Sequence, residues 1–121
     1  MSKNIAFKKA FAFSVLIYRI CKKLKENNKE FDISRQLLRS GTSIGANLAE
    51  SNGAISKADF SNKVSIAYKE GLETKYWLEL TKEIELINED DFIIAYNSVD
   101  EICKILFSII KSTRINNNIN N

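Results

Sequence analysis

The chain contains no proline and only four glycines among its 121 residues. Tight turns between β-strands depend on these two residues, because proline presets φ and glycine permits positive φ. A fold with many short strands therefore has almost no suitable sequence for its connections. In a chain of single-domain length, this shortage predicts one all-α domain.

Apolar residues recur at spacings of three and four through four segments, the pattern of one buried face per helix. We predict helices over residues 4–26, 33–52, 57–86 and 89–113. Short connections make consecutive helices antiparallel, so the expected fold is an up-and-down four-helix bundle over residues 1–115. The third predicted helix, 57–86, is long for a domain of this size, because each helical residue adds about 1.5 Å. Its length predicts an elongated bundle. The Asn-rich tail, 116–121, has little to bury, and we predict it to be disordered.

Two segments carry the signature of a helix start. Ser56 stands three residues before Asp59, and Asn88 stands three residues before Asp91. In such a capping box, each side chain accepts a hydrogen bond from a backbone N–H that lacks a partner within the helix. These boxes predict where the third and fourth helices begin.

Small residues form narrow stripes on the second and third predicted helices. Gly41 and Gly45 share one face of the second, and Ala67, Gly71 and Thr74 share one face of the third. Glycine inside a helix costs up to about 1 kcal/mol relative to alanine, which suggests a packing role. We predict that these two helices approach each other closely through their glycines.

Two carboxylates, Glu70 and Glu73, interrupt an otherwise apolar arc of the third helix. Acids in such a place need hydrogen-bond partners. The second helix offers a polar stripe that could supply them inside the bundle or at a subunit boundary: Gln36, Ser40, Ser43, Asn47 and Glu50.

Residues that usually support catalysis or metal binding are scarce. The chain has no histidine, which removes the commonest general base and the Glu-x-x-His pair of di-iron bundles. It has no Gly-rich phosphate loop, and its two cysteines, Cys21 and Cys103, lie far apart. We therefore predict no enzyme activity, no cofactor and no metal. With no signal peptide and no long apolar run, we expect a cytoplasmic protein that does not enter membranes.

The net charge of +3 is unevenly distributed. Residues 1–30 hold eight Lys or Arg and two acids, whereas residues 88–121 hold three and five. Two interpretations stay open: a nucleic-acid surface, or two neighbouring helices of opposite charge that attract each other. Ordinary solvated lysines compete with the first. The candidate nucleic-acid-binding residues are Lys8, Arg19, Lys22, Lys23, Arg35, Arg39 and Lys57.

The first and fourth helices each show a second apolar face. Phe7, Phe11 and Tyr18 flank the core stripe of the first helix. On the fourth, the extra residues are Ile94, Ile102, Ile105 and Ile109. A monomeric bundle needs one apolar face per helix, so we predict a homo-oligomer. Deeper burial within a tight bundle is the alternative.

Residues 36–51, 56–60, 66–70 and 73–78 resemble, in order, a bacterial four-helix-bundle family named for 23S rRNA intervening sequences, the S23-type intervening-sequence proteins. The resemblance covers about residues 5–112. It implies a homopentameric barrel of four-helix protomers and kinship with the accessory protein of diversity-generating retroelements, which binds nucleic acid and a reverse transcriptase. It brings no catalytic residues. Six motif positions carry over with expected structural roles: Ser43, Asn47, Glu50, Ser56, Glu70 and Glu73.

Two function classes follow from the sequence. The first is a non-catalytic, oligomeric nucleic-acid-binding accessory protein associated with rRNA intervening sequences, with RNA or DNA as its partner. The alternative is a protein-binding scaffold, or an accessory subunit of a reverse transcriptase without its own nucleic-acid site. The genes that neighbour this one would favour the first class if they form an rRNA insert or a reverse-transcriptase cassette.

Overall fold

The computed structural model describes the backbone of residues 3–120 and the side chains of residues 5–114. This backbone forms four helices and no strand: α1 (Lys3–Asn28), α2 (Asp32–Asn52), α3 (Lys57–Glu83) and α4 (Glu89–Asn120). The predicted all-α fold is confirmed. The bounds of α4 extend past the predicted end at residue 113. The tail predicted to be disordered, 116–121, falls outside the described side chains, and that expectation stays a prediction.

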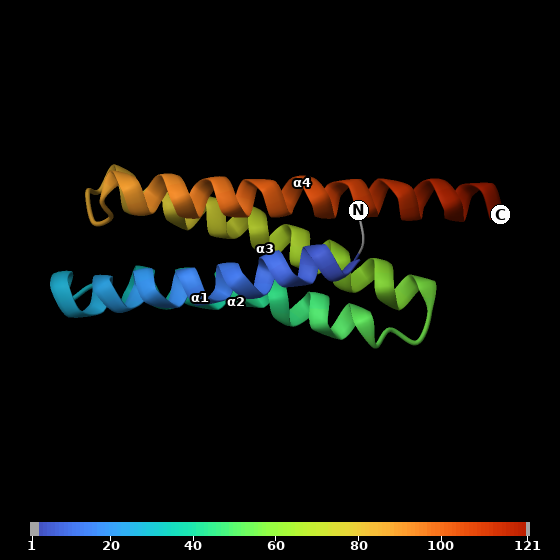
Figure 1. Ribbon diagram of the computed structural model, residues 1–121, viewed down its shortest axis with the longest axis horizontal. Coiled ribbons are helices and arrows are strands. Elements are labelled where there is room, and N and C mark those ends of the chain that lie inside the picture. Colours follow the sequence, from blue (N-terminus) through green and yellow to red (C-terminus); the bar gives the residue numbers. More distant parts are fainter. Residues whose placement is uncertain (1–2, 121) are drawn as a thin grey trace.

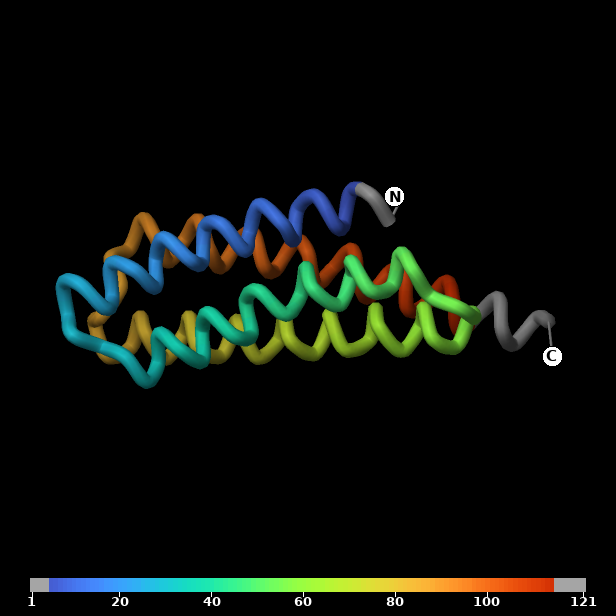
Figure 2. The backbone as a smooth tube through the Cα atoms, turned by 90° about the horizontal axis from the view of Figure 1, so that it is seen from below, coloured from blue at the N-terminus to red at the C-terminus, as the bar shows by residue number. Residues whose placement is uncertain are grey.

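Consecutive helices run antiparallel, so α1 begins and α4 ends at the same end of the molecule (Figure 1). Each helix packs on two neighbours, in the cyclic order α1, α2, α3, α4. Figure 2 shows the same long, narrow bundle from a second direction. Of the four contacts between neighbours, the one between α1 and α4 is the least extensive.

Both predicted capping residues accept the expected backbone hydrogen bond, whereas among the described residues only Asp59 of the two carboxylates accepts one from the backbone, from the Ile55 N–H. Ser56 Oγ accepts a hydrogen bond of 3.0 Å from the Asp59 N–H, and Asn88 Oδ1 accepts one of 2.8 Å from the Asp91 N–H. The end of α3 lies three residues before the predicted end at residue 86, because Glu85 adopts a positive φ of 61°. Helices usually end on glycine or asparagine in this conformation, so a glutamate there gives no signal in the sequence.

The core contains apolar side chains from all four helices. Phe13 and Ile17 of α1, Leu37 of α2, Leu78 of α3 and Leu106 of α4 are 2% exposed or less. The whole predicted stripe of α1 is buried: Ala6, Ala10, Phe13, Ile17, Ile20 and Leu24. Burial of one face on each of four helices is what the apolar spacing predicted.

The tightest contacts of the glycines are not the predicted ones between α2 and α3, although a Cβ on Gly71 would also lie 3.8 Å from Ile44 Cδ1 of α2. A Cβ on Gly41 would lie 2.9 Å from Ile17 Cγ2 of α1, and one on Gly71 would lie 2.6 Å from Cys103 Sγ of α4. Gly45 also faces α1, next to Ser14. Helical spacing shows which residues share a face, but not which neighbour that face meets. The predicted partner was therefore wrong, although the close approach of helices at glycine was right.

Candidate functional site

The glutamates of α3 lie in a polar cluster against α2. Arg39 Nη1 lies 3.2 Å from Glu70 Oε2, and its Nη2 pairs with Glu73. Glu73 also accepts a hydrogen bond of 3.0 Å from Trp77 Nε1. Both acids therefore have partners, but the principal one is Arg39, which we had considered for nucleic acid, and not the polar stripe of α2.

Beneath this cluster, two fully buried hydroxyls join α2 to α3. Thr74 Oγ1 lies 3.0 Å from Ser40 Oγ and 2.8 Å from the Glu70 carbonyl. Both side chains are 0% exposed. Ser40 Oγ also lies 3.4 Å from the Leu37 carbonyl of its own helix, so both buried hydroxyls are satisfied within their helices as well as across the contact.

The remaining motif residues also bond within this chain. Ser43 Oγ donates to the Arg39 carbonyl, and Asn47 Nδ2 donates to the Ser43 carbonyl, each one turn earlier in α2. Glu50 pairs with Lys63 of α3 at 3.2 Å, and Ser56 caps α3. The six motif positions are thus engaged in holding or starting helices.

The described residues contain no group of three or more His, Cys, Asp or Glu that could hold a metal ion. Cys21 and Cys103 are buried, and burial raises the pKa of each thiol to about 11. Both therefore remain protonated at neutral pH, which makes them poor nucleophiles. Within the described part of the chain, no helix is long and apolar enough to cross a membrane.

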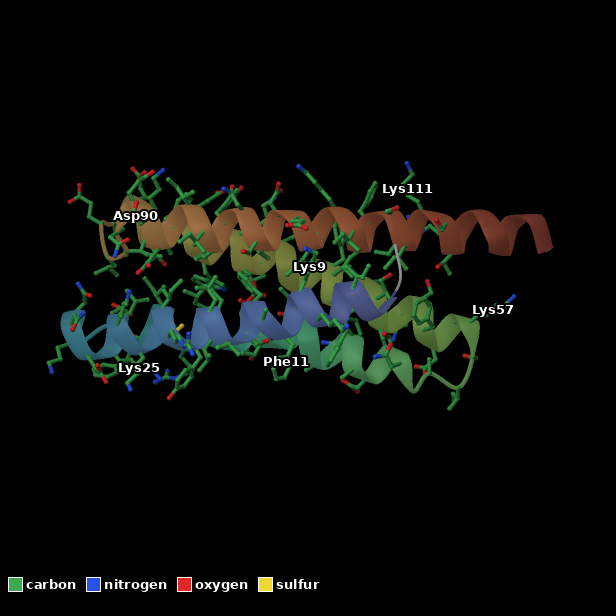
Figure 3. The ribbon with its side chains drawn as sticks, viewed as in Figure 1. Lys9, Phe11, Lys25, Lys57, Asp90 and Lys111 are labelled. Carbon is green, nitrogen blue, oxygen red and sulfur yellow. The ribbon has the colours of Figure 1, made fainter. Side chains whose placement is uncertain are left out.

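The seven candidate basic residues do not form one surface. Three of them pair with acids: Arg39 as described, Lys23 with Asp91 at 3.0 Å, and Arg35 with Asp32 at 3.7 Å. Among the described residues, the other four make no ion pair: Lys8, Arg19, Lys22 and Lys57. Figure 3 shows Lys57 at the end of the bundle opposite Lys25. The unpaired cations that share a helix are those of α1.

Charge attraction between α1 and α4 accounts for part of the uneven charge. Lys9 of α1 pairs with Glu101 of α4 at 2.7 Å, and Lys23 pairs with Asp91 at 3.0 Å. Lys9 points between the two helices in Figure 3. Next to it lies a groove of about 230 Å³, whose lining includes Phe13, Leu16 and Ile102. Charge attraction between helices therefore accounts for Lys9 and Lys23, whereas the nucleic-acid interpretation of the other α1 cations stays a prediction.

The extra apolar residues of α1 and α4 differ in how far they are buried. On α4, Ile102 and Ile105 are buried within the protomer, at 1% and 8% exposed. On α1, Phe11 and Tyr18 remain 61% and 56% exposed, and Val15 lies between them. Our sequence interpretation missed further exposed apolar residues, Leu72 and Tyr76 on α3 and Ile93 and Phe107 on α4. The four-residue spacing of Leu72 and Tyr76, opposite the small-residue stripe, was the available signal.

Comparison with protein families matches residues 2–108 to the 23S rRNA-intervening sequence protein family. Among solved structures, the chain is similar to a protein of unknown function from the S23 ribosomal protein family of Bacteroides thetaiotaomicron VPI-5482. The two share 48% sequence identity with a TM-score of 0.89, over 92% of this chain and 99% of that one. Comparison with curated proteins gives no match.

Proposed function

This chain belongs to the 23S rRNA-intervening sequence protein family, and on that premise we propose that it is a non-catalytic accessory protein that assembles with copies of itself and binds nucleic acid through α1. The observation that carries this proposal is the composition of α1. From Lys3 to Lys25 it has seven Lys or Arg and no acid. A partner of this kind implies a protein that works in the cytoplasm.

The outward side of α1 supplies the charge for phosphate binding. Lys8, Arg19 and Lys22 are exposed and make no ion pair within the described residues, so their charges are available to a ligand. Lys9 and Lys23 are already paired with α4. Contacts of Lys and Arg with phosphate do not read base sequence, and their strength falls with salt.

Self-assembly would multiply this charge. The family resemblance suggests five protomers, and five chains of net charge +3 make a particle of +15. Linked copies raise affinity through avidity even where one copy binds weakly. The exposed apolar residues of α3 and α4 are the candidates for the contacts between protomers: Leu72, Tyr76, Ile93, Ile94 and Phe107.

A salt titration of binding tests the proposal. A labelled RNA hairpin with single-stranded arms serves as the probe, at 50 mM and 200 mM NaCl, with light scattering to give the mass of the particle. We expect an oligomer that binds the probe, loses affinity steeply with salt, and loses roughly tenfold or more when Lys8, Arg19 and Lys22 become Gln.

The matched control is Lys69, Lys104 and Lys111 changed together to Gln, which removes the same charge from exposed positions of α3 and α4. We expect this control to bind within about twofold to threefold of the wild type. An oligomer that binds no nucleic acid at low salt contradicts the proposal and leaves the protein-binding scaffold as the function to pursue.

A further inference from the structure

We propose that the nucleic acid bound by α1 is single-stranded, and that unpaired bases stack on Phe11 and Tyr18 while Lys8, Arg19 and Lys22 contact the flanking phosphates. This inference rests on the proposed function, since it names the ligand of the same basic face. It adds two aromatic side chains that phosphate binding alone does not require.

The two rings are placed as a stacking platform requires. Phe11 and Tyr18 are seven residues apart, which puts them on the same side of α1 and about 10 Å apart along its axis. They are 61% and 56% exposed, although buried aromatic rings are the rule in a core of this size. Figure 3 shows Phe11 and Lys25 on the side of α1 that points away from α4.

Beside Tyr18, the surface between α1 and α2 is hollowed. A groove of about 260 Å³ there is lined by Tyr18, Lys22, Lys25 and Leu38, together with Cys21 and Glu26. Lys22 and Lys25 make no ion pair within the described residues, so two free ammonium groups border an exposed ring. A base on the ring and a phosphate beside it would meet both kinds of group.

Other exposed aromatic residues lack this setting. Tyr76 packs edge-on against Trp77 at 5.0 Å between centroids, in a region that also holds Glu73 and Glu79. Phe107 packs against Tyr68 at 5.7 Å. Tyr18, by contrast, has no ring contact and no hydrogen bond from its hydroxyl among the described residues. Phe11 is tilted against Phe7 at 6.1 Å between centroids, and Phe107 has Lys111 at 5.7 Å from its ring. What distinguishes α1 is that two exposed rings, Phe11 and Tyr18, share one helix with several cations that are unpaired within the described residues.

The chemistry of this face favours unpaired bases over the other occupants. In a duplex the base faces are already stacked on one another, so a ring on a convex helix reaches only the backbone. Stacking on aromatic side chains is the usual way in which single strands are held without sequence preference. A second copy that met this face by two-fold symmetry would bring the same lysines and arginine together, which opposes that contact. A contact in a ring of five would set this face against a different face of the neighbour, and the mass of the particle tests that case.

Fluorescence anisotropy with two probes tests the inference. The probes are a labelled 12-nucleotide oligo(U) strand and a 12-base-pair RNA duplex, both at low salt. We expect the Phe11→Leu, Tyr18→Leu double variant to lose about tenfold or more in affinity for oligo(U) and to keep its affinity for the duplex within about twofold. Leucine keeps the positions apolar and the charge unchanged.

Phe31→Leu is the matched control, because it removes a similarly exposed ring, at 52%, from the connection between α1 and α2, and it should leave oligo(U) binding unchanged. If the double variant binds oligo(U) as the wild type does, stacking is wrong while phosphate binding by α1 stands. If the wild type binds neither probe, both the inference and the proposed function fail. If the double variant changes the mass of the particle in light scattering, these rings are a subunit contact, and the inference is overturned.

Discussion

Between α2 and α3, a fully buried hydroxyl pair lies beneath an arginine that bonds two glutamates, whereas the polar contacts between the described side chains of α1 and α4 are two ion pairs at the surface. The groove between α1 and α4 adds to the contrast, since Leu16 lines it and is only partly buried. We call the contact between α2 and α3 and the contact between α1 and α4 the two seams of the bundle. The seam between α2 and α3 contains buried hydrogen-bonded side chains. The contact between α1 and α4 has an apolar interior, and its polar contacts lie at the exposed edge.

This difference distinguishes the polar residues that hold the fold together from the charged residues that have no partner within the described part of the chain. The stretches by which the sequence resembles its family lie on α2 and α3, and their polar residues bond within the chain. Three exposed cations without an ion pair among the described residues, Lys8, Arg19 and Lys22, share α1 with the exposed rings of Phe11 and Tyr18. We conclude that the polar residues of the family signature hold the helices of the bundle together. The proposed binding of nucleic acid is therefore assigned to α1.

The largest expected difference between the seams concerns their apolar packing. Leu78→Ala should lower the free energy of unfolding by about 2–5 kcal/mol, because Leu78 is fully buried and its removal leaves a cavity. Leu16→Ala removes the same atoms from the edge of a groove and should cost about 1 kcal/mol. Urea denaturation of both variants measures this. Equal losses would show that the α1–α4 seam is as tightly packed as the interior.

The two buried thiols compare how readily α1 and α4 separate from the bundle, because Cys21 lies against Ser34 of α2 and Cys103 against Gly71 of α3. With each pKa raised from 9 to about 11, the thiolate fraction below pH 9 is about a hundredfold lower than for an ordinary cysteine. Labelling by a disulfide reagent at pH 8 should therefore be slow and should rise about tenfold per pH unit. If α1 opens before the rest, Cys21 in a Cys103→Ala variant should react faster than Cys103 in Cys21→Ala. Faster labelling of Cys103 would place the weak seam elsewhere.

The smallest expected difference concerns the ion pairs. Arg39→Gln should lower stability by about 1 kcal/mol, because it leaves Glu70 and Glu73 as neighbouring like charges at 22% and 37% exposed. Lys9→Gln should change stability by about 0.5 kcal/mol or less, since its partner Glu101 is 56% exposed. Thermal melts at low and high salt compare the two. A larger loss for Lys9→Gln would reverse our ranking of the seams.

Much of this fold follows from the sequence, and the errors have specific causes. The apolar spacing and the capping residues Ser56 and Asn88 located the starts of the helices to within one residue, because these signals are local. The partners of Gly41 and Gly71 were wrong, because the order of helices around a bundle is not encoded by the spacing within one helix. The end of α3 was predicted too late, because Glu85 adopts a positive φ that the sequence would have indicated only with a glycine or asparagine there.

The candidate site was harder to predict for a related reason. A list of basic residues does not show which charges are already paired, and Lys23 and Arg39 proved to be bound to acids from other helices. The exposed fraction of Phe11 and Tyr18 was equally hidden, since apolar residues beside a core stripe can turn inward, as Ile102 and Ile105 do. Only the packing of all four helices decides these cases.

The most direct test of the claim that α1 binds nucleic acid is ultraviolet cross-linking of the wild-type protein to oligo(U), followed by trypsin digestion and mass spectrometry. Cleavage after Lys9 and Arg19 releases residues 10–19, a peptide that contains both Phe11 and Tyr18. We predict that this peptide carries the cross-linked nucleotide. Cross-links confined to peptides of α3 or α4, with none on residues 10–19, would contradict the account.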